Sequence, residues 1–143
     1  MTPPAFGHEH LWTVIYDSDC GFCRWSLGLL LGADREHRLR PLALGTSEAD
    51  TLLGDLAPQQ RIASWHLISP GGERESAGAA LPAVLRLLPG GGVPAAILAR
   101  APHATERGYR WVADHRTTIG PLVPSRAKAS ATRRIERRSR ASG

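Results

Sequence analysis

The chain has 143 residues and a net charge of +5, with 42% hydrophobic and 22% charged residues. This size suits one domain with a single core, and the balance of apolar and charged residues excludes a wholly disordered chain. The most apolar stretch, Leu27–Leu31, is far shorter than the roughly 20 residues that cross a bilayer, so the sequence predicts no membrane span.

A strand and a helix are predicted first along the chain. The β-branched and aromatic run at residues 10–16 is typical of a buried strand. Residues 24–33 follow with a leucine-rich pattern that predicts a helix packed against both a sheet and a neighbour. We expect the rest of this helix surface to form a thin solvated stripe made of Arg24, Gly28, Gly32 and Arg35.

A second strand and a short helix come next. Residues 39–44 predict the strand, and Pro41 places it at a sheet edge or at a strand start, because proline cannot donate to a neighbouring strand. Ser47 is the expected N-cap of the short helix that follows. The apolar face of that helix is expected to hold Leu52, Leu53 and Leu56.

The second half of the chain predicts a hairpin and then helices. Residues 64–68 and 73–76 are expected to be strands joined by a tight Pro-Gly-Gly turn. Apolar residues at helical spacing predict a helix at 79–88, which the Pro-Gly-Gly-Gly run after it ends. Two further helical segments are expected at 94–100 and 104–116.

This element order predicts the fold class. A βαβ half followed by a ββα half is the thioredoxin arrangement. We therefore expect an α/β, thioredoxin-like domain over residues 10–118, with a central mixed four-stranded sheet flanked by helices and an extra C-terminal helical segment. Residues 1–9 are expected to be coil, and residues 119–143 to lie outside the domain.

The basic charge is concentrated at the C-terminal end. Residues 125–143 hold seven Arg and Lys residues and one Glu, whereas the remainder holds eleven basic and twelve acidic residues. Because this segment shows no apolar periodicity, residues 119–143 are predicted to be a disordered basic tail. We expect at most a weak contact with an anionic partner, and the lack of aromatic residues in residues 125–143 argues against nucleic acid.

Cys20 and Cys23 stand directly after the first predicted strand, where functional groups of open α/β sheets gather. A disulfide across three residues barely restrains the unfolded chain, so the pair is expected to be chemical rather than structural. If Ser18 or Asp19 caps the next helix, Cys20 lies in its first turn, where free N–H groups and the helix dipole favour a thiolate. Cys20 is then the expected nucleophile and Cys23 the resolving thiol.

Charged residues surround the two cysteines. Asp17 and Asp19 disfavour a nearby thiolate, although one of them is expected to cap the helix. Asp17, at the end of a buried strand, is also a candidate for moving protons to and from Cys23. The alternative, in which both acids only cap and solvate the turn, stays open. Arg24 adds a nearby cation.

The segment YDSDCGFC after a hydrophobic strand resembles the signature of the DCC family, a family of thiol-disulfide oxidoreductase-like proteins. The pattern Asp-x-x-Cys-x-x-Cys is matched by Asp17, Cys20 and Cys23, with Asp19 in the place of a second acid. Segments 78–80 and 109–116 are also similar to that family, so the resemblance covers roughly residues 10–118. It implies a thioredoxin-like fold and a redox activity. We expect a thiol-disulfide oxidoreductase whose substrate is a protein or small-molecule thiol or disulfide.

One feature of thioredoxins is missing. They hold substrate partly through a cis-proline just before the third strand, whereas residues 61–64 stand there in this chain and Pro58 lies too far upstream. Substrate docking is therefore expected to differ from that of a thioredoxin. The residues between the cysteines, Gly21 and Phe22, also differ, so the sequence leaves open whether the pair reduces or oxidises.

Two other functions stay open at this point. A zinc site would need His8 and His10 beside both cysteines, but the first strand carries these histidines toward the opposite end of the sheet. A non-catalytic interaction module, which docks a partner through the late helices or the tail, is the other alternative. We expect no metal and no cofactor. A cytoplasmic location is expected, because His8, Glu9 and His10 interrupt the apolar run of a signal peptide.

Overall fold

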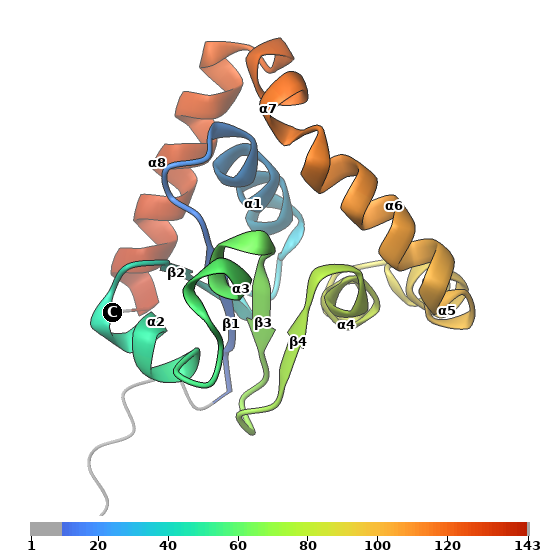
Figure 1. Cartoon of the computed structure of the whole chain (residues 1–143). Coiled ribbons are helices and arrows are strands. Elements are labelled where there is room, and N and C mark those ends of the chain that lie inside the picture. Colours follow the sequence, from blue (N-terminus) through green and yellow to red (C-terminus); the bar gives the residue numbers. More distant parts are fainter. Residues whose placement is uncertain (1–9, 143) are drawn as a thin grey trace, which may run out of the picture.

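The computed structural model describes residues 10–142, which form a mixed four-stranded sheet with helices packed on it (Figure 1). The strands lie in the order β2-β1-β3-β4, with β2 parallel to β1 and the other neighbours antiparallel. This topology confirms the predicted thioredoxin-like sheet and the edge position of the strand that contains Pro41. The strand bounds are β1 Trp12–Tyr16, β2 Leu39–Ala43, β3 His66–Ile68 and β4 Arg74–Ser76.

The helices follow the predicted order, with shifted ends and with additions. The first helix begins three residues earlier than expected, at Gly21, and the helices α3, α7 and α8 were not predicted. Single turns of 3-10 helix, η1 (Ala77–Ala79) and η2 (Gly120–Leu122), connect some of them. The helices are α1 Gly21–Ala33, α2 Ser47–Leu52, α3 Pro58–Ala63, α4 Ala80–Arg86, α5 Gly92–Arg100, α6 Pro102–Asp114, α7 Arg116–Ile119 and α8 Ser125–Ser142.

Alternation along β1 divides the core between the two faces of the sheet. Val14 points into a cluster that contains Leu27 and Leu31 of α1, together with side chains of α4 and α8. Its neighbour Ile15 points to the opposite face, into a cluster with residues of α2 and the segment after it. Because side chains alternate along a strand, the short β1 can hold helices on both faces and bury its own centre completely.

α8 packs along α1 through two glycines, Gly28 and Gly32, which we call the glycine stripe. A Cβ atom at Gly28 would lie 2.4 Å from the Cβ of Ala131, and one at Gly32 would lie 2.6 Å from a guanidinium nitrogen of Arg134. The predicted solvated stripe of α1 is therefore wrong at Gly28, which is buried, whereas Gly32 is exposed as predicted. The glycine at position 28 lets the two helix backbones approach more closely than any side chain would allow.

A buried ion pair holds the far end of α8. Arg138 donates to the Asp34 carboxylate at 2.7 Å and also to the carbonyls of Leu31 and Leu39. Asp34 accepts the N–H groups of Arg38 and Leu39 with the same carboxylate. The prediction that residues 119–143 form a disordered tail is wrong, because residues 125–142 are a helix anchored by this buried network.

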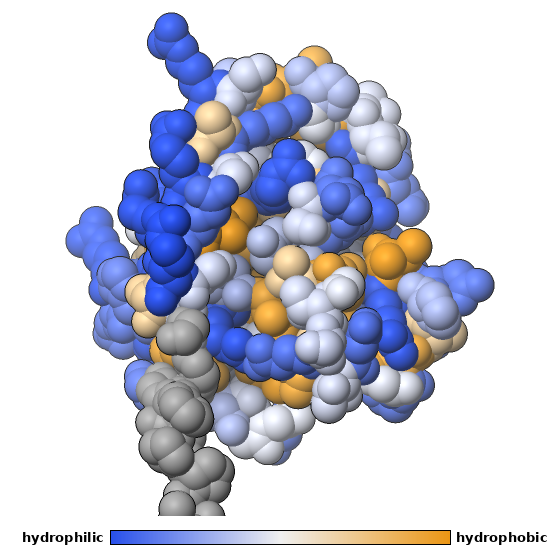
Figure 2. All heavy atoms as spheres, turned by 90° about the vertical axis from the view of Figure 1, so that its left-hand side faces the viewer, coloured by the Kyte–Doolittle hydropathy of each residue, from blue (hydrophilic) through white to orange (hydrophobic). Residues whose placement is uncertain are grey.

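The outer face of α8 stays in solvent. Arg126, Arg133, Arg137 and Arg140 are exposed, and hydrophilic side chains dominate the surface on this side of the molecule, with some apolar residues between them (Figure 2). None of the helices in residues 10–142 has the length and apolarity needed to cross a bilayer. The coil predicted for residues 1–9 lies outside the described residues.

Replacing Arg138 by Met should destabilise the protein strongly, because Asp34 is completely buried and would keep its charge without its cationic partner. Loss of one member of a buried pair costs about 3–5 kcal/mol in the free energy of unfolding. Urea denaturation measures this difference. Arg137→Met, at an exposed position of the same helix, is the matched control. Equal stabilities of the two variants would contradict the anchoring role of Arg138.

Candidate active site

Cys20 is itself the N-cap residue of α1. Its backbone is extended, and its Sγ accepts the N–H of Cys23 at 3.2 Å. The expectation that Ser18 or Asp19 caps the helix is wrong, and Cys20 stands just before the first turn rather than within it. An amide that points at the sulfur suits a thiolate, because a charged acceptor forms the stronger hydrogen bond. The N-terminal end of the helix dipole acts in the same direction.

Cys23 lies in the first turn of α1, and both cysteines are half-buried free thiols. Burial raises the pKa of the Cys23 thiol to about 12, and the hydrogen bond and charge of Cys20 act in the same direction. The positive charge of Arg116 opposes this shift, whereas the negative charge of Asp17 adds to it. Cys23 therefore keeps its proton at neutral pH, which leaves Cys20 as the better nucleophile of the two.

The three charged residues near the cysteines differ in their placement. Asp17 lies at the end of β1, where its Oδ1 accepts the N–H of Asp19 at 3.0 Å, and its side chain lines a cavity beside Cys23. Asp19 is exposed and does not line this cavity. Arg24 donates to the carbonyl of Ser18 and so ties α1 to the loop that precedes it. Of the two acids, the structure thus brings Asp17 to the cavity that Cys23 lines.

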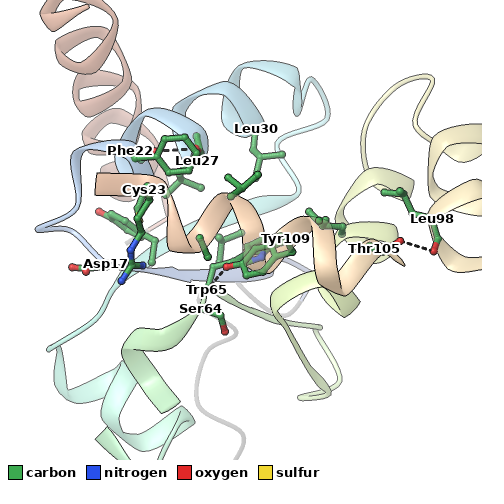
Figure 3. A pocket seen from close by; sticks show the side chains of 18 of the residues that line it. Asp17, Phe22, Cys23, Leu27, Leu30, Ser64, Trp65, Leu98, Thr105 and Tyr109 are labelled. Atoms are coloured by element: carbon green, nitrogen blue, oxygen red, sulfur yellow. Dashed lines mark hydrogen bonds between the residues drawn. The ribbon is translucent and has the colours of Figure 1, made fainter. Parts of the chain in front are cut away.

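A cavity of about 590 Å³ begins beside Cys23 and continues between α1 and α6 (Figure 3). Asp17, Phe22 and Cys23 lie at one end, and Leu98 and Thr105 lie at the other. Most of the lining side chains are apolar. They include Leu27, Leu30, Ile62, Trp65, Leu81, Ile97, Leu98 and Val112.

Two residues of α6 and α7 at this cavity were not predicted as site residues. The Tyr109 hydroxyl accepts the N–H of Trp65 at 3.2 Å, so α6 is bonded to the segment just before β3. Burial raises the pKa of Tyr109, which keeps this hydroxyl protonated. Arg116 lines the cavity and forms no ion pair with the residues that the structure describes. The spacing of Tyr109, Val112 and Arg116, which is that of one helical face, is the signal that could have identified them.

Within the part of the chain that the structure describes, no histidine lines the cavity beside Cys23. His66 is buried in β3, where its ring nitrogens bond the Ser76 hydroxyl and the carbonyl of Arg61. Burial lowers the pKa of His66, which indicates a neutral structural side chain. Within residues 10–142, no three His, Cys, Asp or Glu side chains gather so that they could hold a metal ion. His8, a ligand of the alternative zinc site, lies outside the described residues.

One comparison with known proteins finds a match. A family model described as DCC1-like thiol-disulfide oxidoreductase matches residues 14–121. The matched segment contains the sheet except for the first two residues of β1, both cysteines and the α6–α7 side of the cavity, and it ends before α8 begins. No curated protein and no solved structure matches the chain.

Proposed function

The chain belongs to the DCC1-like thiol-disulfide oxidoreductase family, and on that basis we propose that it exchanges thiols and disulfides through Cys20 and Cys23. The observation that carries the proposal is the difference between the two sulfurs. The Cys20 sulfur caps a helix and faces an amide, whereas the Cys23 thiol is held protonated by burial. A two-step exchange requires one sulfur that attacks the substrate first and a second, protonated thiol that later resolves the mixed disulfide.

The exchange proceeds in two displacements. The Cys20 thiolate attacks a substrate disulfide, forms a mixed disulfide and releases the first substrate thiolate. Cys23 then loses its proton and attacks the Cys20 sulfur, which forms the Cys20–Cys23 disulfide and releases the second substrate thiolate. Overall the cysteine pair loses two electrons and the proton of Cys23, and the substrate gains the two electrons and leaves as two thiolates, which take up protons according to their own pKa values. Every step is reversible, so the same pair can also oxidise a dithiol.

Asp17 is proposed to accept the proton of Cys23 in the second displacement. Its carboxylate and the Cys23 thiol line the same end of the cavity, and the Asp17 charge already influences the Cys23 thiol. A thiol with a pKa of about 12 is almost never ionised at neutral pH, so a nearby base has a large effect on how fast it attacks. Asp19 is exposed and Arg24 holds the loop, so both are assigned supporting roles.

We propose that the substrate is a protein or small-molecule thiol or disulfide. The exchange is proposed to take place in a reducing compartment such as the cytoplasm. There, thiol-based reductants keep a cysteine pair largely as the dithiol. The proposal requires no metal and no cofactor, because the cysteine pair itself carries the electrons.

The reaction with 5,5′-dithiobis(2-nitrobenzoate) tests the two roles. Reduced wild-type protein should release two coloured thiolates per chain, one when Cys20 is modified and one when Cys23 displaces the adduct. Cys23→Ser should release a single equivalent and keep the mixed disulfide on Cys20, visible as an added mass. Cys20→Ser should react much more slowly, because burial holds the proton on Cys23. A stable adduct on Cys23 in the wild type would contradict the assignment.

The second thiolate release also tests Asp17. Asp17→Asn should slow this step on the order of 100-fold at neutral pH if the carboxylate is the base, and the difference should narrow as hydroxide takes over at higher pH. Stopped-flow absorbance measures the rate. If Asp17 acted only through its charge, its removal would lower the pKa of Cys23 and speed the step, so an equal or faster release would contradict the role. Asp19→Asn is the matched control.

A further inference from the structure

The polar groups along the cavity beside Cys23 are largely engaged within the protein. The Thr105 hydroxyl at the far end donates to the carbonyl of Leu98 at 2.9 Å, and the Ser26 hydroxyl donates to the carbonyl of Phe22 at 2.8 Å. Tyr109 accepts the N–H of Trp65. Charged side chains line the cavity only near the cysteine, where Asp17 and Arg116 stand. Away from Cys23, the cavity therefore offers mainly apolar surface.

The segment before β3 offers no main-chain pairing to a peptide at Trp65. An extended peptide substrate binds through main-chain N–H and C=O groups of its host and uses side-chain pockets only for specificity. At Trp65 the N–H goes to Tyr109, and the carbonyl accepts the N–H of Ala77 at 3.3 Å. The indole N–H of the same residue donates to the carbonyl of Ala77. The main-chain groups of Trp65 are therefore not available for strand-like docking.

We propose that the cavity binds the apolar body of a small thiol or disulfide, with an alkyl or aromatic group between α1 and α6 and its sulfur at the Cys20–Cys23 end. The volume of about 590 Å³ is that of sites for small organic ligands. This inference rests on the proposed exchange reaction and names its substrate class. In the mixed disulfide, the substrate sulfur is bonded to Cys20 while its hydrocarbon part remains in the cavity, and the attack of Cys23 releases it as a thiolate.

The entrance of the cavity supports this substrate class. Ile62, Ile97 and Val112 line it and are 55%, 62% and 36% exposed, so an apolar ligand would cover surface that is now in water. Gly108 of α6 also lines the cavity, and a Cβ atom there would meet nothing within 4 Å. A side chain at Gly108 would therefore begin in open space beside the other lining residues, without a clash at its Cβ atom.

Alkyl methanethiosulfonates test the proposal, because ethyl, butyl and hexyl reagents share one leaving group and differ only in the apolar body. Each transfers its alkylthio group to the Cys20 thiolate and releases methanesulfinate. In the Cys23→Ser protein, the rate constant for Cys20 should rise about tenfold or more from ethyl to hexyl, relative to N-acetylcysteine. Gly108→Trp in this background should abolish the rise, and Arg107→Trp, at an exposed position outside the cavity, should keep it.

Three results would overturn the proposal. The first is a hexyl-to-ethyl ratio equal to that of N-acetylcysteine, and the second is a ratio that Gly108→Trp leaves unchanged. The third is a faster reaction with a methanethiosulfonate that carries a hydrophilic tripeptide, because that result would assign the cavity to a peptide. The assay needs only a reactive Cys20, so its failure is distinct from a failure of Cys23 to resolve mixed disulfides in the wild-type protein.

Discussion

The close packing of α8 on the glycine stripe of α1 is the constraint on which the rest of this structure depends. One face of α1 contributes Leu27 and Leu31 to the core at the sheet, and Gly28 and Gly32 lie against α8. The Asp34–Arg138 ion pair then fastens α8 where α1 ends. Held from two sides, α1 has one orientation, and its N-terminal end presents Cys20 and Cys23 at the end of β1. At that same end, the side chain of Lys128 lies against Gly21.

The second consequence of this packing is the cavity. With α8 on its outer side, α1 turns Leu27 and Leu30 toward the cavity that α6 also lines, and Gly120 of η2 lies near Phe22 of the same helix. α6 is tied to the sheet side by the hydrogen bond from Trp65 to Tyr109 and by the one from Gly78 to Glu106. The helices leave a space between them that reaches Cys23. The proposed redox pair and the proposed substrate cavity therefore both lie at the N-terminal turn of α1.

The strands and the cysteine motif were predictable from local patterns, whereas α8 was not. β1 is a β-branched and aromatic run, and a Pro-Gly-Gly turn marks the hairpin of β3 and β4, so each of these signals lies within a few residues. The buried face of α8 consists of Ala131, Ile135, Arg138 and Ser142, which hydrophobicity alone does not recognise as a core face. Arg138 is buried only because it forms an ion pair with Asp34, which lies over 100 residues earlier in the chain. The packing of Ala131 on Gly28, also distant in sequence, turned one position of the expected solvated stripe of α1 into an interface.

At the site, the sequence predicted the two cysteines and the position of Asp17, but neither the capping residue nor the cavity. Cysteine is not among the residues that usually cap helices, whereas Asp and Ser are, so the sequence favours Asp19 and Ser18. Tyr109 and Arg116 reach the cavity only through the docking of α6 and α7, which no local pattern specifies. Their helical spacing marks a common face, and the contact with Trp65 shows what that face meets.

The most direct test of the central claim, that Cys20 and Cys23 act as one redox pair, is an equilibrium titration in glutathione buffers followed by acid quenching and mass spectrometry. The two thiols should disappear together in one two-electron transition, with the intramolecular disulfide as the product. Separate glutathione adducts on the two cysteines, or two thiols that stay reduced across the whole range, would contradict the account.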